Sequence, residues 1–480
     1  MSNTSLKTTV EWQEWRDINW LKVERQVFKL QERIYRASES RDFVAFRKPQ
    51  KTLLKSWYAK LLAVRGVIQD NQSEKILSSE KLFALAETLD ITGKVKSRRG
   101  TIEDYALQIL VKMVLEPEWE AIFEPSCYGF MPGRSPQDAV EAIFGFVKLE
   151  PKYVLEADIA KSSEGINYQL LLERLGTYPT LRRKIKAWLK AGVMDGEGLF
   201  PTEEQMTRGG VISSFLANVA LHGMEEQIKE YAEIFDFQSV ESGYEISRVD
   251  RSEYLGLVRY GSSLAIAHKD IDVVQKCLVK VGEWLSEMGL ELKPSGTRIV
   301  HTLYGYGGEK PGFDFLGFNI RQYEVGKNQS KLGFKTEVKP SDQSMKSHYR
   351  QIAEVIDRHK SAPQVALIRR LNPIIRDWVN YYSAVVSKKA FRDLDYLVYQ
   401  KLWRWARRRH SKKNNDWVSQ KYWHSGENRK EFSCSDRDGS RVKLLKYTEV
   451  PIVRQENVNK DWFYQNVGTR PALSRRGGSG

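Results

Sequence analysis

The chain has 480 residues, of which 41% are hydrophobic and 29% are charged, so a sizeable folded core is expected and global disorder is excluded. Its 76 lysines and arginines exceed its 61 aspartates and glutamates by 15, a balance typical of proteins that bind a polyanion. The three cysteines, Cys127, Cys277 and Cys434, lie far apart, which excludes a disulfide framework or a zinc ribbon and fits a reducing compartment. No apolar run is long enough to cross a bilayer and no secretory start is expected, so we predict no membrane partner.

The segment from residue 20 to 65 is predicted to form two basic helices separated near Pro49. Val23, Val27 and Ile34 recur at helical spacing, and lysines and arginines are interleaved with the apolar positions. A basic amphipathic face is either merely solvated or an RNA contact, and the pattern favours the two about equally. The candidate RNA-binding residues here are Lys29, Arg33, Arg36, Lys55 and Lys60.

The middle of the chain predicts an α+β sheet domain. Residues 153–159 form a strand that delivers Asp158 at its end. Residues 257–260 and 264–267 form two short strands joined by Gly261, Ser262 and Ser263, which is the pattern of a hairpin. A helix that stops at Gly289 and a strand over 313–318 follow, and this alternation is typical of α+β folds.

From about residue 340 the pattern becomes helical, and residues 401–413 carry seven lysines and arginines with no acid. Like charges this dense repel one another unless an anion neutralises them, so we expect the cations to face RNA rather than only solvent. The aromatic residues among them are expected to be mainly core. The candidate RNA-binding residues here are Arg369, Arg370, Lys401, Arg404, Arg407, Arg408, Arg409, Lys412, Lys413 and Lys421.

Taken together, these landmarks resemble the group II intron-encoded reverse transcriptases and maturases of bacteria and plastids. The resemblance covers nearly the whole chain and is strongest at EPEWEAIFEPSCYGF, YVLEADIAKS, GFDFLGFNIRQY and LNPIIRDWVNYY. It implies an α+β fold built as a degenerate right-hand polymerase. The implied parts are a basic helical extension (1–75), fingers and palm (76–330), an all-helical thumb or maturase domain (331–428), and a remnant of a basic DNA-binding region with a disordered tail and no endonuclease (429–480).

The chain departs from the family pattern where a polymerase holds its metals. The family uses three aspartates to bind two Mg²⁺ ions. Asp158 matches one of them, but the Asp-Asp pair of the hairpin is replaced by Ser262 and Ser263. A neutral hydroxyl does not supply the charge that two dications require, so Asp158 is expected to be vestigial. Other departures agree, namely Ser162 to Gly165 after the strand, Arg208 for a glutamine, Met131 for an arginine, Gly296 for a lysine and a shortened fingers segment between residues 71 and 101.

The resemblance therefore implies an RNA-binding splicing cofactor, not an enzyme, that stabilises the active fold of a group II intron. It would need no cofactor of its own, because the Mg²⁺ belongs to the bound RNA. Two alternatives stay open: a reverse transcriptase with residual activity through substitute ligands such as Glu156 or Glu164, and a non-functional remnant of a mobile element. The expected partner is structured intron RNA; weak DNA binding through the carboxy-terminal region, a homodimer, and a location in bacterial cytoplasm or plastid stroma are also open.

Overall fold

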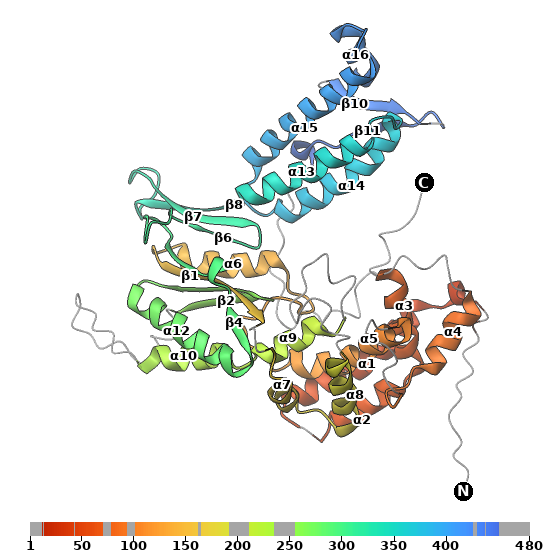
Figure 1. The fold of residues 1–480 in the computed structure, drawn as a ribbon, viewed down its shortest axis with the longest axis vertical. Coiled ribbons are helices and arrows are strands. Elements are labelled where there is room, and N and C mark those ends of the chain that lie inside the picture. Colours follow the sequence, from red (N-terminus) through yellow and green to blue (C-terminus); the bar gives the residue numbers. More distant parts are fainter. Residues whose placement is uncertain are drawn as a thin grey trace.

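The computed structural model describes residues 12, 14–42, 44–70, 78–93, 101–161, 165–191, 211–234, 255–425, 430–436 and 438–450. Figure 1 shows the carboxy-terminal helices at the top, the amino-terminal helices at the lower right and a central sheet at the lower left. The buried hydrophobic residues form two clusters, one shared by the amino-terminal helices and the inner face of the sheet, the other by its outer face and the carboxy-terminal helices.

The amino-terminal helices pack around α5. After the short turn η1 (Trp15–Asp17) come α1 (Trp20–Glu39), α2 (Arg47–Lys55), α3 (Trp57–Asp70), α4 (Ser79–Thr88) and α5 (Ile102–Glu120). Val23, Val27 and Ile34 are buried, as their spacing predicts. The prediction of two helices separated at Pro49 is wrong, because three helices form and Pro49 lies in the first turn of α2. A proline is tolerated there because a first-turn N–H has no partner within the helix.

The central sheet is built on β1 (Tyr153–Lys161). Its neighbours β3 (Ser263–His268), β4 (Leu290–Leu292) and β5 (Arg298–His301) all run antiparallel to it, and β2 (Gly256–Tyr260) pairs with β3. Helix α12 (Ile271–Glu287) covers one face, and α6 (Pro136–Val147) covers the other. Because side chains alternate along a strand, Leu155 joins the first hydrophobic cluster and Val154 the second.

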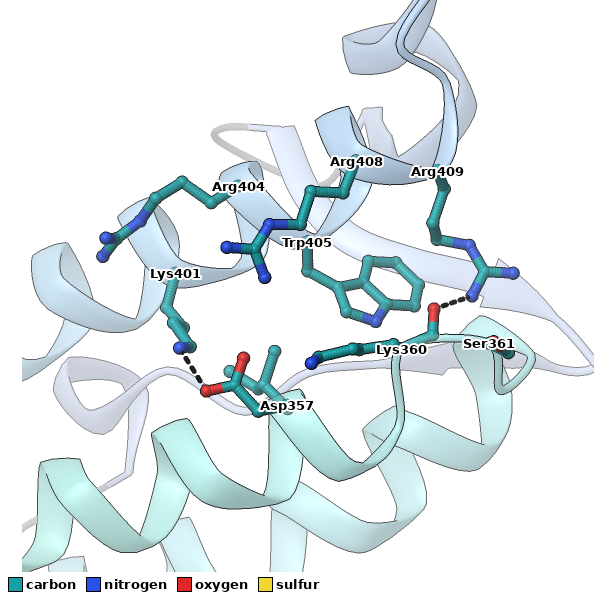
Figure 2. Close-up of a pocket in the computed structure, with 9 residues that line it drawn as sticks. Asp357, Lys360, Ser361, Lys401, Arg404, Trp405, Arg408 and Arg409 are labelled. Carbon is teal, nitrogen blue, oxygen red and sulfur yellow. Dashed lines mark hydrogen bonds and ion pairs between the residues drawn. The ribbon is translucent and has the colours of Figure 1, made fainter.

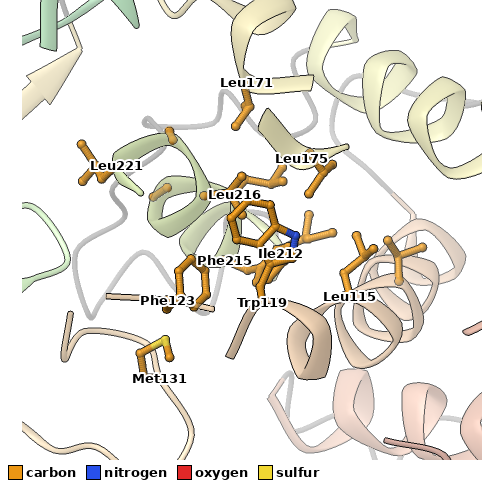
Figure 3. Packing of buried hydrophobic residues seen from close by; sticks show 14 of the residues in the cluster. Leu115, Trp119, Phe123, Met131, Leu171, Leu175, Ile212, Phe215, Leu216 and Leu221 are labelled. Carbon is orange, nitrogen blue, oxygen red and sulfur yellow. The ribbon is translucent and has the colours of Figure 1, made fainter. Parts of the chain in front are cut away.

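Four further helices flank the sheet: α7 (Tyr168–Leu175), α8 (Pro179–Lys190), α9 (Ser213–Leu221) and α10 (Met224–Ile234). Every residue of α9 is buried. Figure 3 shows Phe215 and Leu216 of α9 packed near Trp119, in the last turn of α5, and Phe123, which follows that helix. The sheet and the amino-terminal helices are therefore joined by one continuous core.

A second sheet connects the palm to the thumb helices. Its strands are β6 (Phe313–Phe315), β7 (Phe318–Glu324) and β8 (Phe334–Pro340), so the single strand expected over 313–318 is in fact interrupted by a tight turn. Leu316 and Gly317 form that turn with φ of 49° and 78°. Tyr381 and Tyr382 donate hydrogen bonds to their carbonyls, at 3.0 and 3.1 Å.

The thumb contains α13 (Asp342–Arg358), α14 (Gln364–Tyr382), α15 (Lys388–Arg409) and α16 (Asn415–Tyr422). Strands β9 (Trp423–Ser425), β10 (Lys430–Ser435) and β11 (Arg441–Lys443) and the turn η4 (Tyr447–Glu449) pack onto these helices. Phe432, Leu444 and Tyr447 belong to the same hydrophobic cluster as the helices. The described residues after 429 are thus part of the thumb unit. The tail over 475–480 lies outside the described residues.

Candidate nucleic-acid interface

The end of β1 lies beside the turn of the β2–β3 hairpin. Asp158 stands opposite Ser263 in the antiparallel register, and the Ser263 hydroxyl donates a hydrogen bond to Asp158 Oδ1 at 3.0 Å. Gly261 and Ser262 form the turn, with Gly261 at a φ of 59°, and the Ser262 carbonyl accepts a hydrogen bond from the Ile159 N–H at 2.8 Å. The fold therefore brings Asp158, Ser262 and Ser263 together, as the sequence analysis expects.

The donor set at this strand end does not fit a pair of Mg²⁺ ions. It offers one carboxylate and two hydroxyls, whereas hard dications take several charged oxygens. Within the ranges that the structure describes, no three His, Cys, Asp or Glu side chains are grouped to hold a metal ion. The η3 turn (Pro294–Gly296) also lies against the carboxylate, since a Cβ on Gly296 would stand 2.9 Å from Asp158 Oδ2.

Glu156, a candidate substitute ligand, is engaged in an ion pair. Arg298 Nε donates to it at 2.8 Å, and the same guanidinium reaches Glu309 at 3.1 Å. Burial raises the pKa of the Glu156 carboxyl, while the hydrogen bond and charge of Arg298 oppose that shift. The other candidate, Glu164, lies outside the described residues, and so does Arg208.

A cationic surface lies at the end of α15. We define the α15 cation cluster as Lys401, Arg404, Arg407, Arg408 and Arg409. Arg404, Arg407 and Arg408 are exposed, and Lys412 and Lys413 continue the exposed surface beyond the helix. Arg407 hydrogen-bonds to Asn415, and within the described part of the chain Arg404 Nε makes only a long contact of 3.4 Å with the Gln400 carbonyl. These three guanidinium groups are thus available to an anion.

The remaining two members of the cluster hold α13 against α15. Lys401 pairs with Asp357 of α13 at 2.7 Å. The Arg409 guanidinium donates to the carbonyls of Lys360 and Ala362 at 2.7 and 3.0 Å, and lies 4.6 Å from the centre of the Trp405 ring. Cations near the last carbonyls of a helix also suit the helix dipole. These contacts of Lys401 and Arg409 stabilise the packing of α13 against α15.

A cavity of about 270 Å³ opens between the end of α13 and α15. Figure 2 shows the side chain of Arg408 reaching from α15 toward Asp357 and Lys360, with Trp405 beside it, whereas the Arg404 side chain extends away from Arg408 at the edge of the view. The cavity is lined by Ile356, Asp357, Lys360, Ser361, Lys401, Arg404, Trp405, Arg408 and Arg409. Lys360 is not among the candidate residues predicted from the sequence. The sequence shows only that Lys360 lies in a basic stretch near the end of α13, and the local sequence pattern does not indicate that α15 lies opposite.

The other predicted thumb residues lie around the same unit. Arg369 is exposed and ion-paired with Asp436, whereas Arg370 is exposed on the same turn of α14. The ammonium groups of Lys413 and Lys421 lie 5.3 and 4.9 Å from the centre of the Trp417 ring. Trp405, Tyr422 and Trp423 are buried, so the expectation that the aromatic residues here are mainly core is confirmed.

The predicted residues of the amino-terminal helices form a separate surface. Lys29, Arg33 and Lys55 are exposed, and Arg36 is exposed but paired with Glu32 at 2.6 Å. Lys60 is half-buried, and burial lowers the pKa of its ammonium group although Asp90 and Glu87 oppose the shift. These helices and the thumb lie at different ends of the molecule (Figure 1), so the two predicted sets are not brought together.

Comparisons with protein families cover most of the described fold. The N-terminal domain of reverse transcriptase matches residues 15–82, reverse transcriptase (RNA-dependent DNA polymerase) matches residues 92–320, and the group II intron, maturase-specific domain matches residues 345–423. The last range runs from the first turn of α13 through α16 to the first residue of β9. These matches confirm a reverse-transcriptase-like α+β fold with a helical maturase domain.

The individual proteins that resemble this chain share less than a third of its residues in the aligned regions. Maturase-like protein 1 of Euglena gracilis is 23% identical over 395 residues, covering 76% of this chain and 76% of that protein. Group II intron-encoded protein LtrA of Lactococcus lactis subsp. cremoris is 28% identical over 147 residues, covering 29% of this chain and 24% of that protein. A structure of telomerase from Candida albicans with a telomeric RNA fragment aligns at a TM-score of 0.31 and 11% identity, over 72% of this chain and 60% of that one. Among the described residues no helix is both long and apolar enough to span a membrane.

Proposed function

The chain belongs to the family of group II intron-encoded reverse transcriptases and maturases, and we propose that it acts as a maturase that has lost polymerisation. In this proposal the protein binds structured group II intron RNA and stabilises its catalytically active fold. The observation that carries the proposal is the contrast between the two ends of the molecule. The β1 end pairs its one carboxylate with a serine, while α15 presents exposed arginines that have no acidic partner among the described residues.

The thumb surface supports the RNA-binding part of the proposal. Structured RNA is recognised largely through its shape, its phosphates and its 2′-hydroxyls. Arginine suits phosphate because its planar guanidinium donates two parallel hydrogen bonds. Arg404, Arg407 and Arg408 are exposed on α15, and Lys412 and Lys413 extend the same surface. Binding through such contacts should weaken steeply as salt increases.

The palm supports the part of the proposal that concerns catalysis. With Ser262 and Ser263 beside Asp158, the strand end has one carboxylate where the family has three, and Glu156 is held by Arg298. We therefore place the Mg²⁺ that splicing requires on the RNA and propose no metal or cofactor for the protein itself. A reverse transcriptase with residual activity and an inactive element remnant are the competing outcomes of the tests below.

Splicing of the intron that surrounds or neighbours the reading frame tests the proposal. The transcript is incubated at low Mg²⁺ with and without the purified protein. We expect the protein to accelerate splicing, and the combined variant Arg404→Gln, Arg407→Gln, Arg408→Gln to lose most of that acceleration. Arg409 is left unchanged because its hydrogen bonds join α13 to α15. The control variant Lys310→Gln, Lys327→Gln, Lys331→Gln removes the same charge from exposed positions outside the thumb helices and should behave as the wild type.

No acceleration together with salt-sensitive RNA binding would contradict a role for this intron and direct the search to another. No acceleration and no RNA binding would favour the element remnant.

Binding of an unrelated DNA duplex measures the DNA contact of the carboxy-terminal region, and sedimentation of the protein alone measures the homodimer. The bacterial or plastid source of the transcript then decides the compartment.

Primer extension tests the loss of polymerisation separately. We expect no deoxynucleotide incorporation by the wild type on a primed RNA template. Incorporation that disappears in Asp158→Ala would overturn this part of the proposal, because it would require Asp158 to hold a metal. The variant Ser262→Asp, Ser263→Asp should also be inactive, because the other departures from the family pattern, such as Met131 and Gly296, remain.

A further inference from the structure

The cavity between α13 and α15 contains more positive charge than its own residues neutralise. Lys360, Lys401, Arg404, Arg408 and Arg409 line it, and Asp357 is the one acidic residue in its lining. Two of these cations are already satisfied, Lys401 by Asp357 and Arg409 by the carbonyls after α13. The side chains of Lys360 and Arg408 make no hydrogen bond or ion pair with any residue that the structure describes, and Arg404 makes only its 3.4 Å contact.

The electrostatic environment of Asp357 agrees with this description. The pKa of its carboxyl is lowered, first by the hydrogen bond from Lys401 and further by the charges of Lys401, Lys360 and Arg408. Lys360 and Arg408 therefore act on the carboxylate from opposite walls of the same cavity. Lys360 and Arg408 approach each other without an acid of their own and therefore repel one another, and a bound anion would remove that repulsion.

The size and walls of the cavity limit the anion. A volume of about 270 Å³ is at or just below the low end of the roughly 300–1,000 Å³ that is usual for small-molecule sites. The concave space between two helices admits one phosphate with part of its sugar, but it does not admit the face of a duplex. The exposed cations Arg407, Lys412 and Lys413 lie outside this cavity, on open surface.

We propose that this cavity binds a single phosphate of the RNA backbone that projects from a sharp bend or an extruded nucleotide. Arg408 of α15 and Lys360 after α13 donate to its oxygens, and Arg404 adds positive charge at the rim of the cavity. Asp357 keeps Lys401 in place at the edge of the cavity, and Arg409 orients the turn that carries Lys360. The inference rests on the proposed function in taking RNA as the source of the phosphate, and it adds that the thumb recognises backbone shape at one defined point.

Arg407 and Arg408 provide a matched pair for the test. They are adjacent, equally charged and both exposed, but only Arg408 lines the cavity. Successive residues of an α-helix are separated by about 100° around its axis, so the two guanidinium groups leave α15 in different directions. A surface that only needs positive charge would respond equally to the loss of either one.

The experiment measures the affinity of the full-length protein for the intron transcript at fixed salt. We expect Arg408→Gln and Lys360→Gln each to weaken binding about tenfold, the loss of one charged hydrogen-bonding contact, and Arg407→Gln to weaken it by less than about threefold. Asp357→Asn, which removes the acid of the cavity, should leave binding at least as tight as in the wild type. Melting temperatures of the variants exclude misfolding. Equal losses for Arg407→Gln and Arg408→Gln would overturn the proposal.

Two further measurements separate the source of the phosphate and the maturase role. Single methylphosphonate substitutions in the RNA remove one phosphate charge at a time. At one position the substitution should weaken binding to the wild type about tenfold but leave Arg408→Gln unaffected. Binding of 5′-AMP that depends on Arg408, with RNA affinity unchanged in Arg408→Gln, would instead assign the cavity to a free nucleotide and overturn the RNA proposal. A difference between Arg407 and Arg408 without any stimulation of splicing would support the cavity and contradict a maturase role for this intron.

Discussion

The charged side chains near the end of β1 are paired within the protein, whereas the end of α15 carries more cations than nearby acids can pair. At β1, Asp158 accepts a hydrogen bond from Ser263, and Glu156 is paired with Arg298. At α15, Arg404 and Arg408 face a cavity whose one acidic residue, Asp357, is already paired with Lys401. Internal pairing is sufficient to explain the first set, whereas the second set has charge left over.

In both regions the fold is set by the apolar interior rather than by the charged and polar residues on the surface. The palm sheet keeps a continuous apolar core on both faces although its hairpin carries serines. The thumb likewise keeps a packed interior, with Trp405 and Tyr447 buried, beneath an outer face crowded with cations. Apolar burial supplies most of the folding free energy, so polar strand ends and helix faces are free to change with function.

The largest effect that would sharpen the comparison concerns RNA affinity. The combined variant Arg404→Gln, Arg407→Gln, Arg408→Gln should lose about a hundredfold in affinity at physiological salt, and its plot of log affinity against log salt should be shallower by about 2 to 3. Filter binding over a salt series measures both quantities. An equal loss in the variant Lys310→Gln, Lys327→Gln, Lys331→Gln would show that the contact is diffuse and would break the comparison.

The dependence of stability on pH compares the two regions, because each contains a buried histidine. Burial lowers the pKa of His268 in the palm and of His348 in the thumb to about 4. The unfolded chain binds these protons near pH 6.5, so it holds more protons than the folded chain between pH 6.5 and 4, and stability falls as the pH decreases through that window. Between pH 7 and pH 5 each histidine should cost about 2 kcal/mol of unfolding free energy.

Urea unfolding at pH 7 and pH 5 measures this loss. His348→Gln should reduce the difference between the two pH values by about 2 kcal/mol, the contribution of this one histidine. The Tyr447 hydroxyl, which lies 2.6 Å from His348 Nε2, provides a partner for the replacing amide. An unchanged pH dependence in the variant would indicate that folding does not lower the pKa of His348.

The smallest effect is expected at the palm. Asp158→Asn keeps an oxygen that accepts the Ser263 hydrogen bond, so the unfolding free energy should change by less than about 1 kcal/mol and splicing should be unaffected. Thermal unfolding of the protein alone, with and without Mg²⁺, adds a direct check. Stabilisation by Mg²⁺ that is present in the wild type and absent in Asp158→Asn would show that the carboxylate still binds a metal.

Much of the fold could be predicted from local pattern. The strand ending near Asp158, the β2–β3 hairpin and the apolar face of α1 all follow from side-chain periodicity and turn residues. The tight turn at Leu316 and Gly317 was not predictable in this way, because a leucine seldom adopts a positive φ. Contacts from Tyr381 and Tyr382, more than sixty residues later in the chain, accompany that turn.

By itself, the sequence determined which chemical groups each region contains: one aspartate and two serines at the palm hairpin, and a dense run of cations at the end of α15. The tertiary structure alone decided which of those groups are already engaged. Lys401 meets Asp357, 44 residues earlier, and Arg409 meets the Lys360 carbonyl, 49 residues earlier, while Arg408 meets neither. The reason is physical: a side chain's charge belongs to the residue, but its partner is set by the packing of α13 against α15, which brings together residues remote in sequence.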